Sequence, residues 1–338
     1  MTDVGEPTGV GGEKDLIADS GVVGTEAAVV RRMRRRRRRM ATNVVLQIFA
    51  MIAIGMLVYP QGADWLSRIG HNADISGYVA RVADTPSEER ERILEAAYGY
   101  NDELQPGPLT DPYTSLAEDE ALRSKLYLAY EEMLRISGTD AIGTLSYPAV
   151  GIGLPVFHGT AENTISRGIG HLYGTSLPVG GPDTHAVLTS HSGLPHAQLF
   201  SPLHKAKVGD TFWISVLGED HYYRVERIET VLPGQTDSLE IIAGEDWVTL
   251  FTCTPIGVNT HRLMVHAIRI PDHEALGVDK IAGDGIRLGF PWWAVWFGGG
   301  SLTVGWLLFA PQRAAGKKSG KRLAMTTNDD GEEARKFQ

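Results

Sequence analysis

The chain has 338 residues, a length that can hold two ordinary domains. Its formal net charge of -9 averages over very unequal segments, because a dense arginine run stands near the N-terminus. A single cysteine, Cys253, excludes an intrachain disulfide, and the sequence contains neither an H-E-x-x-H nor a C-x-x-C metal motif.

The N-terminal segment is expected to be a disordered cytoplasmic tail. Residues 1–30 are rich in Gly, Glu and Asp without sustained periodicity, and eight arginines crowd positions 31–39. An arginine run of this kind can bind nucleic acid. The apolar run that follows at once favours another explanation, namely the positive charge that flanks a membrane span on its cytoplasmic side. We therefore predict a cytoplasmic tail over residues 1–40 and no nucleic-acid partner.

Two uncharged apolar runs predict two transmembrane helices. The first, residues 41–60, is just long enough to cross a bilayer, and the alternative of a cleaved signal peptide lacks an A-x-A-like site. The second, residues 290–310, has three tryptophans at its first end and basic residues after its other end. We therefore expect a multi-pass protein of the cell membrane, with both termini cytoplasmic and residues 61–289 extracellular. Residues 272–289 would be a juxtamembrane segment and residues 311–338 a cytoplasmic tail.

The first extracellular part, residues 61–138, is expected to be helical. Thr85 and Glu88 form a capping-box pattern ahead of an amphipathic helix over residues 85–104. Ser115 opens a second such pattern ahead of another amphipathic helix. A Pro/Gly-rich loop separates the two predicted helices.

After Gly138 the sequence changes to short runs of Val, Ile, Thr, Tyr and Phe, separated by Gly, Pro and Asp. Many short strands with turn residues between them indicate an all-β sandwich or barrel over residues 139–271. The segment SVLGEDHYY predicts a hairpin with Gly218 in its turn. The extracellular part is therefore expected to be mainly β, with a small helical region before it.

Cys253 is informative because exported proteins normally use their cysteines in disulfide pairs. If residues 247–252 and 262–270 are adjacent antiparallel strands, Cys253 lies near Arg262 at the open end of the sheet. A guanidinium favours the thiolate and can hold an oxyanion. A thiol nucleophile also needs a proton shuttle, and His191 ranks first because it ends a strand pattern and enters a Gly/Pro loop. These residues alone do not decide between a reactive thiol and a buried, structural cysteine.

The segments TLFTCTP and NTHRLMVHA resemble the T-L-x-T-C…R signature of sortases, the cysteine transpeptidases of Gram-positive cell surfaces. The match is closest to class C, the pilin-polymerising sortases, and covers roughly residues 75–310. It implies a closed eight-stranded β-barrel. It also implies that Cys253, His191 and Arg262 are the catalytic cysteine, histidine and arginine of the family. Some sortases use calcium, but no compact acidic cluster compels a metal site, and no cofactor is expected.

The resemblance also suggests a lid over residues 110–114. Class C sortases carry a D-P-[WFY] triplet there, which matches Asp111, Pro112 and Tyr113, although Trp is common where Tyr113 stands. In this interpretation the aromatic ring blocks the groove over the thiol and the carboxylate engages Arg262. The alternative is that Asp-Pro is simple turn chemistry before a helix.

By resemblance, the thiol attacks the Thr–Gly bond of an LPxTG-like sorting signal, and a lysine on a neighbouring pilin resolves the thioester into an isopeptide bond. The expected partners are pilin subunits with such signals and acceptor lysines, together with the lipid bilayer. A membrane-anchored cysteine hydrolase or protease, and a cell-wall-anchoring sortase of another class, are the alternatives. A non-enzymatic surface adhesin is disfavoured.

Overall fold

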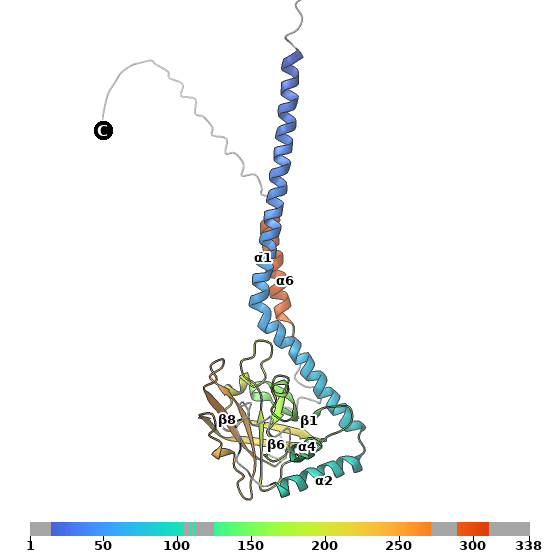
Figure 1. The fold of residues 1–338 in the computed structure, drawn as a ribbon, viewed down its shortest axis with the longest axis vertical. Helices are drawn as coiled ribbons and strands as arrows, with labels where there is room; N and C mark the ends of the chain where they lie inside the picture. The colour runs from blue at the N-terminus through green and yellow to red at the C-terminus, as the bar shows by residue number, and fades with distance from the viewer. Residues whose placement is uncertain (1–14, 105–108, 110, 112–124, 272–288, 311–338) are drawn as a thin grey trace, which may run out of the picture. The chain divides into compact units, whose positions relative to one another are not determined.

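The structure is a computed structural model that describes residues 15–104, 109, 111, 125–271 and 289–310 (Figure 1). The chain divides into two compact units, one formed by residues 1–49 and 301–338 and the other by residues 50–300. The helices are α1 (Asp15–Asp84), α2 (Ser87–Glu103), α4 (Lys125–Glu131), α5 (Glu162–Ile165) and α6 (Trp292–Phe309), with 3-10 turns η1 (Pro148–Val150), η2 (Ser201–Lys205) and η3 (Asp237–Leu239). The strands are β1 (Ala141–Tyr147), β2 (Ile152–His158), β3 (Ile169–His171), β4 (Thr184–Thr189), β5 (Thr211–Val216), β6 (Glu219–Val231), β7 (Asp246–Thr254) and β8 (His261–Arg269).

In the smaller unit, polar side chains of α1 hydrogen-bond to backbone carbonyls of α6. Asn43 Nδ2 donates to the carbonyl oxygen of Leu308 over 2.6 Å, and Gln47 Nε2 donates to that of Ser301 over 2.9 Å. Hydrogen bonds of this kind hold helices together in an apolar environment. They give a structural reason for a glutamine inside the first apolar run.

Helix α1 is longer than the sequence analysis predicts. It runs without interruption from Asp15 to Asp84, so the expectation of disorder is wrong for residues 15–40. The segment is rich in Arg, which is a good helix former. The first apolar run, residues 41–60, is likewise not a separate helix, because α1 continues through Pro60.

Only the first of the two predicted membrane spans is supported. Among the described residues, one helix is long and apolar enough to cross a membrane, and it is α1. Helix α6 has 18 residues, but a Gly-Gly-Gly segment and several tryptophans lower its hydropathy. The second span is therefore not confirmed.

The predicted capping box at Thr85 does not form. Helix α2 begins at Ser87 and has no side-chain cap, while Thr85 Oγ1 donates to the carbonyl oxygen of Arg81 over 2.7 Å. Because α1 and α2 follow one another so closely, Thr85 completes the last turn of α1 instead of starting α2. The second predicted box, at Ser115, lies outside the described residues.

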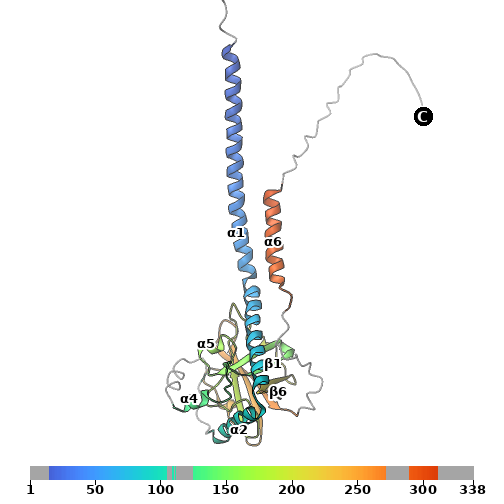
Figure 2. The ribbon, with the colours of Figure 1, turned by 90° about the vertical axis from the view of Figure 1, so that its right-hand side faces the viewer.

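Eight strands close into a barrel in the order β1-β2-β3-β4-β7-β8-β6-β5, which confirms the predicted barrel. Figure 2 shows two of its strands, β1 and β6. The hairpin predicted from SVLGEDHYY is β5–β6, and Gly218 occupies its turn with φ of 91°. Helix α2 is fixed to the barrel by Asn101, which donates to the carbonyl oxygen of Leu177 over 3.1 Å and accepts from its N–H over 2.7 Å. The helical region therefore packs on the barrel as one body with it.

The two faces of the strands carry different apolar clusters. The inward-facing residues of β7, such as Val248 and Leu250, belong to the main core. Residues two positions apart lie on the same side of a strand, so Phe251 and Cys253 share the outer face. A second, smaller core covers that face just before Cys253, and its buried members are Leu172, Val187, Leu239, Phe251 and Met264.

Buried histidines predict a barrel that is sensitive to acid. Burial lowers the pKa of His171 and that of His266 from 6.5 to about 4. Below pH 6.5 the unfolded chain binds protons that the folded chain does not, so the free energy of unfolding falls as the pH drops from 6.5 to about 4. Each histidine contributes about 1.4 kcal/mol per pH unit within this window.

Chemical denaturation of the full chain in detergent at pH 7.5, 6.5 and 5.5 measures the effect. The His171→Gln variant is expected to show a shallower pH dependence, because one of the buried histidines with a lowered pKa is gone. A free energy of unfolding that stays constant between pH 6.5 and 5.5 would contradict the assignment.

Candidate active site

The parallel pairing of β4 with β7 brings His191 next to Cys253. The register pairs Thr189 with Phe251, and each candidate residue follows its strand residue by two positions. In a parallel pair with this register, both candidates lie on the same face of the sheet. The pairing therefore joins two segments far apart in the sequence at one end of the barrel.

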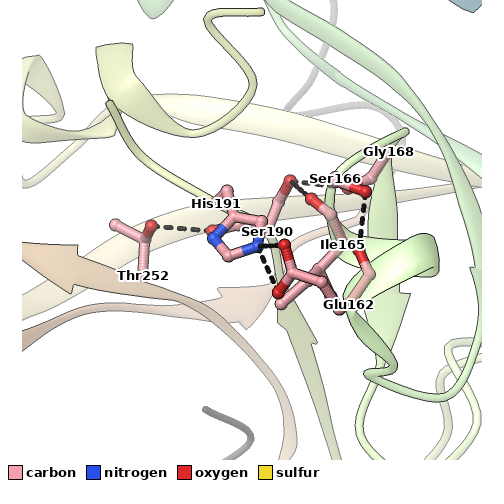
Figure 3. Close-up of polar contacts among 7 residues, drawn as sticks. All are labelled: Glu162, Ile165, Ser166, Gly168, Ser190, His191 and Thr252. Carbon is pink, nitrogen blue, oxygen red and sulfur yellow. Dashed lines mark hydrogen bonds and ion pairs between the residues drawn. The ribbon is translucent and has the colours of Figure 1, made fainter. Parts of the chain in front are cut away.

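Two hydrogen bonds continue this pairing beyond β4. Thr252 Oγ1 donates to the carbonyl oxygen of Ser190 over 2.7 Å (Figure 3). Ser192 Oγ donates to the carbonyl oxygen of Cys253 over 2.6 Å. His191 stands between these two cross-links, so its backbone is fixed beside that of Cys253.

The β7–β8 hairpin brings Arg262 directly opposite Cys253, as the sequence predicts. Both residues are 7% exposed. Cys253 is thus the last buried residue of its strand, because Thr254 after it is only partly buried. A small accessible surface at the end of a strand suits a nucleophile better than a residue sealed within the core.

Arg262 forms a buried ion pair with Asp111. Its Nη2 and Nε atoms lie 2.9 and 3.0 Å from Asp111 Oδ2, and the two side chains are 8% and 2% exposed. Nη1 donates to the carbonyl oxygens of Asn259 and His261 over 3.1 and 3.2 Å. The carboxylate expected from the lid therefore engages Arg262, whereas Pro112 and Tyr113 lie outside the described residues.

A second contact holds the same segment, and no pattern in the sequence indicated it. Leu109 packs against the outer apolar cluster that contains Phe251 and Met264. Thr236 Oγ1 donates to the carbonyl oxygen of Leu109 over 3.2 Å. Residues 109 and 111 are thus held at two points on the face that leads to Cys253.

His191 has a carboxylate partner that the sequence analysis also missed. Its Nε2 lies 2.9 and 3.0 Å from the two carboxylate oxygens of Glu162 at the start of α5 (Figure 3). The His191 side chain is 18% exposed and that of Glu162 is 78% exposed. A carboxylate acceptor fixes the orientation of the ring, and its negative charge compensates the positive charge of the imidazolium. The two residues are 29 positions apart, so no local pattern could have revealed the pair.

Removal of this carboxylate is expected to lower the rate of turnover without weakening substrate binding. In Glu162→Gln we expect kcat to fall about three- to tenfold, because an exposed charged hydrogen bond contributes modestly. KM is expected to stay within a factor of about two, since the expected role of Glu162 is to orient His191. Steady-state kinetics over a range of pH measures both parameters, with Glu226→Gln on β6 as the control. Equal kcat in the two variants would contradict the positioning role.

Within the described residues, no group of three or more His, Cys, Asp and Glu side chains is arranged to hold a metal ion. A thiol, an imidazole and a guanidinium on adjacent segments can perform nucleophilic acyl transfer, with the guanidinium stabilising an oxyanion.

Comparison with known proteins agrees with this chemistry. The sequence model of the sortase domain matches residues 145–270. Sortase A of Streptococcus agalactiae serotype III (strain NEM316) is 32% identical over 129 residues, which are 37% of this chain and 51% of that protein. Sortase A of Bacillus anthracis is 29% identical over 128 residues, or 58% of its length. The chain thus spans only a little over half the length of these curated relatives.

Solved structures extend the match beyond the barrel. Sortase C-1 from Actinomyces oris is 42% identical, with a TM-score of 0.52, over 54% of this chain and 99% of that chain. Sortase C1 of Streptococcus agalactiae is also 42% identical, with a TM-score of 0.53, over 59% of this chain and 95% of that chain. Identity at this level over nearly the whole of the solved chains, on the same closed barrel, shows that the chain belongs to the sortase family and that its structural neighbours are sortase C enzymes.

Proposed function

We propose that the protein is a membrane-anchored class C sortase that joins pilin subunits. It cleaves an LPxTG-like sorting signal through a thioester acyl-enzyme and transfers the acyl group to a pilin lysine. The main support for the proposal is that Cys253, His191 and Arg262 lie together at one end of the barrel. Asp111 forms an ion pair with the guanidinium of Arg262 there. A structural neighbour described as the pilus-related sortase C of Group B Streptococcus, 41% identical over 96% of its chain, supports the pilin assignment.

In the first half-reaction the Cys253 thiolate attacks the carbonyl carbon of the substrate threonine. Arg262 stabilises the resulting oxyanion, because its charge does not titrate and its donors are fixed in a fork. The protonated His191 then gives its proton to the departing glycine amine as the C–N bond breaks. A thioester and a free amine result.

In the second half-reaction the lysine amine attacks the thioester carbonyl carbon. His191 takes the proton from the amine, the C–S bond breaks and the thiolate is regenerated. Water competes with the amine for the same carbon, so a covered groove favours transfer over hydrolysis. The apolar cluster beside Cys253, which includes Phe251 and Met264, limits the approach of water from that side.

The described geometry corresponds to a closed site. Arg262 cannot donate to a substrate oxyanion with Nε and Nη2 while both bind Asp111. We propose that Asp111, Pro112 and Tyr113 form a lid that must leave before substrate binds. Leu109 and Asp111 are its two anchoring points in the described part of the chain.

Anchoring in the membrane is proposed to use α1, with the arginine run on the cytoplasmic side and the barrel outside the cell. Helix α6 is proposed as a second, shorter span that returns the C-terminus to the cytoplasm. Its hydrogen bonds with α1, from Asn43 and Gln47, fit neighbouring helices in a bilayer.

The proposal is tested by incubating the full chain in detergent with an LPxTG peptide and mapping the adduct by mass spectrometry. We expect a thioester on Cys253 that is resolved by an added lysine peptide into an amide-linked product. Release of the free acid alone, even with excess lysine peptide, would favour a hydrolase. Transfer to a cell-wall-type oligoglycine amine in preference to lysine would favour a sortase of another class.

A further inference from the structure

Helix α1 leaves its apolar run close to an interfacial pair of tryptophans. The run ends at Tyr59, and the rings of Trp65 and Trp293 lie 6.3 Å apart. Trp65 Nε1 donates to the carbonyl oxygen of Gly289 over 2.9 Å. Tryptophan is enriched at the boundary between membrane and water. In an anchored protein, this pair therefore marks the level at which α1 leaves the hydrocarbon.

Next to Trp65, side chains of α1 hydrogen-bond to the loop of residues 192–200. Asp64 Oδ1 accepts from the Gln198 backbone N–H over 2.8 Å, and Arg68 Nη2 donates to Gln198 Oε1 over 3.0 Å. Arg68 Nε also binds Asp64 Oδ2 over 2.9 Å, and the Asp64 side chain is only 14% exposed. Three contacts among Asp64, Arg68 and Gln198 make this a defined attachment, here called the Gln198 clamp.

The height of the clamp follows from helix geometry. Asp64 comes five residues after Tyr59, or about 7.5 Å along the helix axis. The headgroup layer on one side of a bilayer is about 5–7 Å thick. The Gln198 clamp therefore lies at the outer edge of the headgroups.

The clamped loop belongs to the active-site end of the barrel. The Phe200 N–H donates to the carbonyl oxygen of His191 over 3.0 Å. The β7–β8 loop packs on the same loop, because a Cβ on Gly193 would come within 2.6 Å of Ile256 Cγ2. The site residues and the clamp are thus linked by direct contacts within one compact unit.

We infer that the active-site end of the barrel faces the bilayer and that Ile256 and Val258 touch the lipid headgroups. Both side chains are apolar, and they are 47% and 65% exposed at the tip of the β7–β8 loop. The inference rests on the membrane anchoring in the proposed function. It deepens that function by restricting the substrate to a peptide whose scissile bond lies at the outer surface of the headgroup layer.

A matched pair of labels tests this orientation. Ile256 and Ile242 are 47% and 46% exposed, and they flank opposite ends of β7. Nine residues of strand separate those ends by about 30 Å. Each is changed to Cys in a full-length Cys253→Ala chain, labelled with a fluorophore and reconstituted in phosphatidylcholine–phosphatidylglycerol vesicles that contain headgroup nitroxide lipids.

Quenching at position 256 is expected to exceed quenching at position 242 by about threefold or more, given that separation. Asp64→Ala is expected to reduce the difference, whereas Asp74→Ala on the same helix leaves it unchanged. Equal quenching at both positions, with circular dichroism unchanged, overturns the inference. The quenching measurement requires no catalysis, so the two proposals fail separately. If the parent chain with Cys253 is active but quenching is equal at both positions, only the orientation is refuted. If quenching is strong at position 256 but the parent chain with Cys253 is inactive, only the transpeptidase is refuted.

Discussion

Replacing Cys253 with alanine is expected to abolish formation of the acyl-enzyme and of the isopeptide product. In the proposed mechanism Cys253 supplies the nucleophile, and no other cysteine exists in the chain to replace it. We expect a loss of at least about a thousandfold in kcat/KM, as for the removal of the nucleophile in other acyl-transfer enzymes. Peptide cleavage followed by chromatography measures this rate.

The fold is expected to survive the same substitution. Cys253 packs at the end of a strand, and removal of one sulfur atom costs about 1 kcal/mol in the free energy of unfolding. Thermal unfolding of Cys253→Ala and of the parent chain should therefore nearly coincide. Met264→Leu, in the neighbouring apolar cluster, is a control that should lower stability slightly and keep activity. Retained activity in a folded Cys253→Ala chain would exclude the thioester mechanism.

Replacing Asp111 with alanine is expected to open the site. The Asp111 carboxylate is 2% exposed, and loss of one partner of a buried ion pair costs about 3–5 kcal/mol because the other charge stays uncompensated. Arg262 then regains water only if the segment at residue 111 moves away. We expect the rate of Cys253 labelling by a methanethiosulfonate reagent to rise about ten- to hundredfold, since local opening controls access.

Two comparisons make this experiment decisive. Asp102→Ala, at an exposed position of α2, should leave the labelling rate unchanged. Tyr113→Ala tests the remainder of the proposed lid and should also raise the rate. Unchanged labelling in both Asp111→Ala and Tyr113→Ala would contradict the lid assignment.

The parts of the fold that depend on short-range patterns could be predicted from the sequence. Alternating β-branched and aromatic residues indicated the barrel strands, and a connection of a few residues between β7 and β8 placed Arg262 near Cys253. The residues alone left His191 as a first choice among several histidines, and family resemblance strengthened it. The same resemblance, and no pattern in the residues, suggested Asp111.

The parts that depend on distant contacts could not be predicted. Glu162 reaches His191 from a four-residue helix, and Gln198 reaches Asp64 across 134 positions. Neither segment has a periodicity that would distinguish it from an ordinary loop. The length of α1 could not be predicted for a different reason, because residues 1–30 have no sustained periodicity that would indicate a helix.

The parallel β4–β7 pairing also has a consequence for biogenesis. Ser190 and Thr252, which close the last cross-link between the two segments, are 62 positions apart in the chain. Long-range parallel contacts form late during folding, because their loop-closure entropy must be met before they contribute. A newly made chain therefore passes through an interval in which Cys253 is not yet beside His191. In the proposed mechanism, other peptides are thereby protected from acyl transfer until the barrel has formed.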